Sequence, residues 1–67
     1  MKYLVTKEWQ YMPKTKWRGG KYRLHMRQID EEQDKWQLRY EYHDSTLTAW
    51  CNAYKPPLDI EWIKKDG

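Results

Sequence analysis

The chain has 67 residues, with 13 Lys and Arg against 10 Asp and Glu, which gives a formal net charge of +3. Because domains usually run to roughly 100–200 residues, this length predicts one small domain over 1–67. Aromatic residues make up 16% of the chain, with five Trp and six Tyr, which is far more than disordered segments carry. We therefore expect a folded protein whose core depends on large side chains.

Composition also narrows the class of protein. One Cys cannot form an internal disulfide, and it excludes a multi-Cys zinc site. No apolar run approaches the roughly 18 residues of a membrane span, and the first ten residues lack the apolar centre of a signal peptide. The sequence thus predicts an intracellular, cytoplasmic protein that uses no metal and no cofactor and does not contact a membrane.

The first predicted element is a strand over residues 3–11. Its alternation puts four apolar or aromatic side chains on one face, interrupted by Lys7: Tyr3, Val5, Trp9 and Tyr11. A loop follows, in which Pro13 and the pair Gly19–Gly20 interrupt regular structure.

Two clear period-two strands come next, joined by a polar turn over residues 30–34. If Ile29 faces Lys35, the inward pairs are Met26 with Leu38, Leu24 with Tyr40, and Tyr22 with Tyr42. The same register sets Arg27 opposite Gln37, His25 opposite Arg39, Arg23 opposite Glu41 and Lys21 opposite His43 on the outer side.

Residues 46–54 fit two structures. Leu47, Trp50, Cys51 and Tyr54 have helical spacing, whereas a two-residue turn at Asp44–Ser45 would make a strand. The strand would set Leu47 opposite Tyr42, Ala49 opposite Tyr40, Cys51 opposite Leu38 and Ala53 opposite Trp36, each a small or medium residue against a large one, and we favour it. Cys51 would then point inward and be unreactive.

The last segment, residues 57–65, also has two interpretations. It is either a strand with Leu58, Ile60 and Trp62 inward, or a short helix with Pro at its start and lysines at its end. The expected fold is mainly β: a small antiparallel meander of four or five strands, barrel-like or packed on one face by a terminal segment, with room for one short helix in 46–54 or 57–65.

Charge is unevenly placed along the chain. Residues 1–29 hold eight basic residues and one acid, whereas residues 30–67 hold five basic and nine acidic residues. The predicted binding residues are the outward cations of the sheet, Trp50 opposite Arg39, and the cations and Trp of the preceding loop: Lys14, Lys16, Trp17, Arg18, Lys21, Arg23, His25, Arg27, Lys35, Arg39 and Trp50. Such a surface suits nucleic acid, because cations bind phosphates and an exposed ring stacks on bases; a merely solvated basic face is the plainer alternative.

Catalysis is not expected. His25 and His43 lie about 13 Å apart in the predicted register, at about 3.3 Å per residue, which is too far for two groups to act on one phosphate. The hypothesis is a non-enzymatic protein that binds nucleic acid or another polyanion. The alternative is an inhibitor or adaptor, of the small viral or mobile-element type, that docks on an acidic protein surface through Trp, Tyr and Arg anchors. The sequence leaves the oligomeric state open, including pairing of edge strands between copies.

Overall fold

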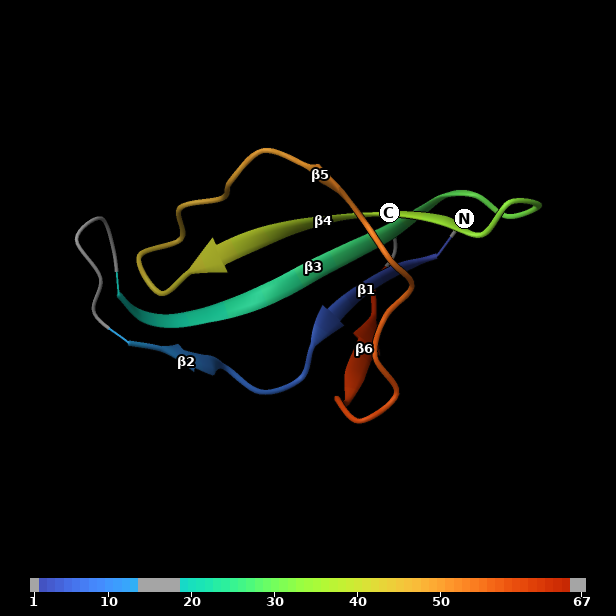
Figure 1. Ribbon diagram of the computed structural model, residues 1–67. Helices are drawn as coiled ribbons and strands as arrows, with labels where there is room; N and C mark the ends of the chain where they lie inside the picture. Colours follow the sequence, from blue (N-terminus) through green and yellow to red (C-terminus); the bar gives the residue numbers. More distant parts are fainter. Residues whose placement is uncertain (1, 14–18, 66–67) are drawn as a thin grey trace.

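The computed structural model describes residues 2–13 and 19–65. They form one antiparallel sheet of six strands: β1 (Tyr3–Thr6), β2 (Gln10–Met12), β3 (Gly20–Asp30), β4 (Lys35–Tyr42), β5 (Cys51–Ala53) and β6 (Trp62–Lys64). The spatial order is β5-β4-β3-β1-β6, and β2 pairs with β3 beside β1 (Figure 1). The mainly β, antiparallel prediction is confirmed, but the sheet is open rather than barrel-like, and the described residues include no helix.

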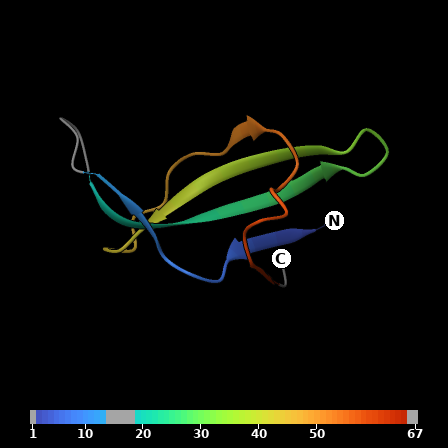
Figure 2. The same ribbon diagram turned by 60° about the horizontal axis from the view of Figure 1, so that its bottom comes forward.

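The β3–β4 hairpin is the centre of the sheet (Figure 2). Its register agrees with the prediction at six pairs, from Tyr22 opposite Tyr42 to Arg27 opposite Gln37. The prediction for Ile29 is wrong, because a bulge between Gln28 and Asp30 brings Asp30 opposite Lys35. An extra residue in one strand leaves that residue unpaired, and the Ile29 side chain is accordingly exposed.

The first predicted strand is divided into two. β1 places Val5 opposite His25, and β2 places Tyr11 opposite Lys21, so the connection holds two residues more than an unbroken strand would need. The ladder between β1 and β3 ends at Thr6, whose buried hydroxyl accepts the Leu24 N–H at 3.1 Å in place of a backbone carbonyl. An insertion of two residues preserves the alternation, so β1 and β2 present the same faces.

Strand pairing replaces the helix alternative in both ambiguous segments. In 46–54, β5 pairs Leu38 with Cys51 and Trp36 with Ala53 as expected, but Leu47 bridges to Glu41 instead of Tyr42. Cys51 is exposed on this short edge strand, so the inward prediction for its thiol is wrong.

In 57–65 only Trp62–Lys64 are a strand, and β6 pairs with β1 rather than continuing the meander. Ile60 and Trp62 are partly buried, but Leu58 is fully exposed. The prediction that Leu58 points inward is therefore wrong.

Residues 54–61 cross from the β5 edge to the β6 edge and provide the second layer (Figures 1 and 2). They cross the sheet face that includes Leu4, Met26 and Trp36, which we call the core face. The Trp62 indole N–H donates to the Pro57 carbonyl at 3.0 Å and fixes the end of the crossing. Within the described part of the chain, no helix is available that could traverse a lipid bilayer.

Candidate functional site

The opposite side of the sheet gathers the charged side chains, and we call it the cation face: Tyr3, Val5, Arg23, His25, Arg27, Arg39 and Glu41. The register places them together, because Tyr3 lies opposite Arg27, Val5 opposite His25 and His25 opposite Arg39. Tyr3 and Val5 therefore share a face with the cations and not with Met26 and Leu24. Val5 is only 1% exposed, so this face has a buried layer of its own.

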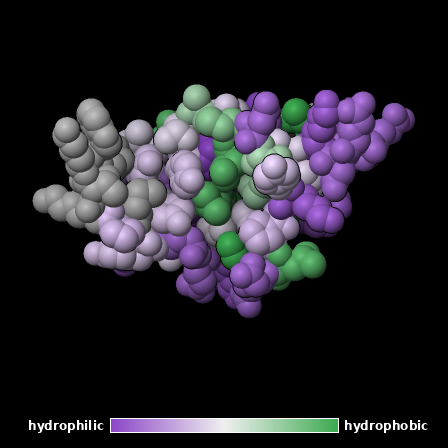
Figure 3. Space-filling model, viewed as in Figure 1, coloured by the Kyte–Doolittle hydropathy of each residue, from purple (hydrophilic) through white to green (hydrophobic). Residues whose placement is uncertain are grey.

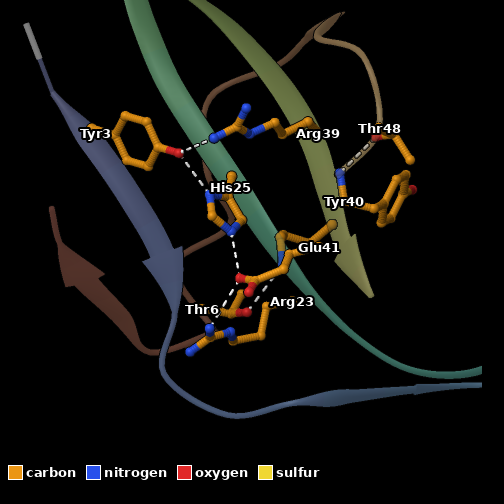
Figure 4. A network of polar contacts seen from close by, with 9 residues as sticks. Tyr3, Thr6, Arg23, His25, Arg39, Tyr40, Glu41 and Thr48 are labelled. Atoms are coloured by element: carbon orange, nitrogen blue, oxygen red, sulfur yellow. Dashed lines mark hydrogen bonds and ion pairs between the residues drawn. The ribbon is translucent and has the colours of Figure 1, made fainter. Parts of the chain in front are cut away.

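A chain of hydrogen bonds crosses the middle of the cation face (Figure 4). His25 Nε2 lies 2.8 Å from Glu41 Oε1, and His25 Nδ1 lies 2.6 Å from the Tyr3 hydroxyl. Since an ionised carboxylate only accepts, Nε2 carries the proton, and the Tyr3 hydroxyl donates to Nδ1. Arg39 Nη2 donates to the same Tyr3 oxygen at 2.8 Å, and Arg23 Nη2 donates to Glu41 at 2.9 Å.

The protonation of this chain follows from burial and charge. Burial lowers the pKa of His25, and the charges of Arg39 and Arg23 lower it further, against the raising effect of Glu41. Burial raises the pKa of Glu41, but the hydrogen bond from His25 and the neighbouring charge of Arg23 outweigh it and leave that pKa below its usual value. His25 is thus neutral and Glu41 ionised near neutral pH.

Two arginines pack on one indole at the same face. The guanidinium carbons of Arg27 and Arg39 lie 4.2 and 4.5 Å from the centroid of the Trp50 ring. Tyr3 contacts the same indole edge to face, with 5.8 Å between centroids. Arg27 also donates through Nε and Nη2 to Gln37 Oε1, at 3.0 and 2.8 Å.

Within the described part of the chain, neither Arg27 nor Arg39 has an acidic partner. Over residues 2–13 and 19–65, the ion pairs join Lys7 to Glu61 and join both Arg23 and His25 to Glu41. Arg39 Nε is buried without any hydrogen-bond partner in the structure, as is Arg23 Nε. Because a partly buried charge is unfavourable without a counter-charge, the pair Arg27 and Arg39 is suited to take an anion from outside.

A second contact between an arginine and an indole lies near β2 on the cation face. The Arg23 guanidinium lies 4.4 Å from the Trp9 ring centroid, and Trp9 packs edge to face on His43. Lys21 and Tyr11, which are opposite one another, are both exposed beside it.

The structure brings together six of the predicted binding residues on one face: Lys21, Arg23, His25, Arg27, Arg39 and Trp50. Lys35 lies at the far end of β4, opposite Asp30. Lys14, Lys16, Trp17 and Arg18 lie outside the described residues. The prediction that His25 faces water is wrong, because this side chain is only 6% exposed beneath Tyr3 and Glu41.

Tyr3 and Trp9 are the main site residues that the sequence analysis did not include. The alternation in residues 3–11 did mark their common face, but it does not say which face of the next strand they share. That information comes from the pairing of β1 with β3, which joins residues about twenty positions apart.

Both ring nitrogens of His25 are engaged by side chains of the protein, because Nε2 donates to Glu41 and Nδ1 accepts from Tyr3. Within residues 2–13 and 19–65, no group of three or more His, Cys, Asp and Glu side chains could hold a metal ion. Comparison of the chain with protein-family models, with curated proteins and with solved structures found no match, so function is inferred from its own residues.

Proposed function

We propose that the protein is a non-enzymatic binding protein that takes the phosphate backbone of single-stranded nucleic acid on its cation face. The observation that carries the proposal is the pair Arg27 and Arg39, stacked on Trp50 and without a carboxylate partner in the described chain. A guanidinium stacked on an indole is fixed in plane. Arg27 donates to Gln37 through Nε and Nη2, and Arg39 donates to Tyr3 through Nη2, so the phosphate contacts fall to the remaining Nη N–H groups of the two arginines.

The other residues of the cation face also suit a negatively charged ligand. Lys21, Arg23, Arg27 and Arg39 lie there with the carboxylate of Glu41, and His25 is neutral. The exposed Tyr11 beside Lys21 offers a ring on which an unpaired base can stack. Arg23 is neutralised by Glu41, so we assign the phosphate contacts to Arg27, Arg39 and Lys21.

The proposal is tested by fluorescence anisotropy with a labelled single-stranded oligonucleotide at about 50 mM and about 200 mM salt. Wild type should bind at low salt, and affinity should fall steeply at higher salt. Arg27→Gln should weaken binding several-fold and reduce the slope of log affinity against log salt by about one.

Two further variants sharpen this test. Lys64→Gln removes the same charge from β6, away from Arg27 and Arg39, and should change binding little. Trp50→Ala keeps both charges but removes the stacking surface, and should weaken binding. Absence of binding by wild type at low salt, or equal effects of Arg27→Gln and Lys64→Gln, would refute the proposal.

A further inference from the structure

The core face is incompletely covered and carries an open groove. Two hollows of about 690 and 330 Å³ adjoin there, because both are lined by Asp34, Trp36 and Lys55. The larger extends over Ile29 and Tyr54, and the smaller lies under Leu58. Figure 3 shows apolar surface in the middle of this side of the molecule, next to strongly polar surface at the β3–β4 turn. Volumes of about 300–1,000 Å³ are typical of sites that hold a ligand.

The rim of this groove presents large apolar side chains that the fold does not use. Tyr54 is 94% exposed, and Leu58 is fully exposed. They lie on either side of Lys55-Pro56-Pro57, in the segment that crosses the sheet. The rings of Pro56 and Pro57 restrict the backbone between Tyr54 and Leu58, which lowers the entropy that this segment loses when a partner binds.

The charge around the groove is positive. Lys2, Lys35 and Lys55 line it together with Asp34, and Asp30 lies opposite Lys35. Asp34 Oδ1 already accepts the Trp36 indole N–H at 2.7 Å and the Gln28 amide at 3.0 Å. Asp30 therefore offsets Lys35, and the ammonium groups of Lys2 and Lys55 are the ones left for a partner at the rim.

We propose that this groove binds an extended acidic segment of a partner protein, with an apolar side chain of that segment seated against Trp36 between Tyr54 and Leu58. Carboxylates beside the anchor would meet Lys2 and Lys55, which supplies charge complementarity at the rim of an apolar centre. The site is on the opposite side of the sheet from Arg27 and Arg39, so it is independent of the nucleic-acid proposal.

The experiment is a selection from a random peptide display library against the full chain, followed by anisotropy measurements with the best selected peptide. Selected sequences should combine acidic residues with one or two large apolar residues. Lys55→Glu and the double variant Tyr54→Ser/Leu58→Ser should each lower the affinity for the peptide by about tenfold or more, the size expected for anchor positions. Tyr54 and Leu58 are exposed, so the double variant should keep the fold, which circular dichroism checks.

Arg27→Gln is the matched control, because it alters only the cation face and should leave peptide affinity unchanged. Binding of the labelled oligonucleotide to Lys55→Glu gives the reverse control and separates failure of this site from failure of the cation face. The proposal is overturned if no peptide is enriched, if the enriched peptides are basic, or if Arg27→Gln weakens the peptide as much as Lys55→Glu does.

Discussion

The two faces of this sheet are stabilised by different forces. On the core face, Met26 and Trp36 are removed from water beneath a crossing segment. On the cation face, Val5 is buried under a layer in which Tyr3, His25 and Glu41 bond to one another and arginines stack on indoles. A domain of this length buries only about 60% of the surface that its unfolded chain exposes, so apolar contacts alone leave a thin margin. The comparison indicates that a very polar short chain can use the second face of its sheet as a polar, hydrogen-bonded layer.

The largest expected effect tests the core face. Trp36→Ala removes a side chain that is 5% exposed, and we expect the free energy of unfolding to fall by about 3–5 kcal/mol. Urea denaturation followed by circular dichroism measures it. Tyr54→Ala is the control, because that ring is exposed and its loss should change stability by less than about 0.5 kcal/mol. Similar losses for the two variants would show that Trp36 is not a core residue.

The next effect tests the cation face. Glu41→Ala leaves Arg23 and the His25 N–H without their acceptor, and we expect a loss of about 1–3 kcal/mol in the same assay. Glu61→Ala breaks an exposed ion pair with Lys7 and should cost less than about 1 kcal/mol. If Glu41→Ala is no more costly than Glu61→Ala, the polar layer does not contribute to folding.

The smallest expected effect is the pH dependence of the free energy of unfolding, which tests the buried histidine of the cation face. Folding lowers the pKa of His25, so the unfolded chain binds a proton more readily than the folded protein once the pH falls below about 6.5, the ordinary pKa of histidine. Stability should therefore decrease as pH is lowered from 7 toward 5. The lowered pKa of Glu41 acts in the same direction below 4.5.

Urea midpoints at a series of pH values measure this dependence. His25→Gln should flatten it between pH 7 and 5, whereas His43→Gln, which removes the other histidine, should preserve it. A dependence that follows His43 instead of His25 would contradict the neutral assignment of the buried ring.

The sequence was most informative where interactions are local. The alternation in 21–27 and 36–42, with one short turn, was enough to obtain six strand pairs of the central hairpin. From that register followed the grouping of Arg23, Arg27 and Arg39 on one side. The partner of each residue is fixed there by counting from the turn, with no need for distant information.

Contacts between segments far apart in the sequence could not be predicted by counting residues from a turn. The exchange of a backbone bond for the Thr6 hydroxyl, the pairing of β6 with β1, and the burial of His25 under Tyr3 all depend on which strands become neighbours. The charge pattern marked the arginines as cations facing outward. The register also set Arg23 opposite Glu41 and Arg39 opposite Trp50, but it did not show that Trp9 packs on Arg23.

The position of β6 has a consequence for the order of folding. Its Lys64 lies opposite Leu4, so the outer side of the first strand stays unsatisfied until almost all of the described chain has been synthesised. The β3–β4 hairpin closes only a short loop and can form early. The pairing of β1 with β6 closes a loop of most of the chain, so it forms later and at a greater entropic cost. In the interval β1 is an open edge to which another chain could add, so aggregation on the ribosome or during refolding should begin there.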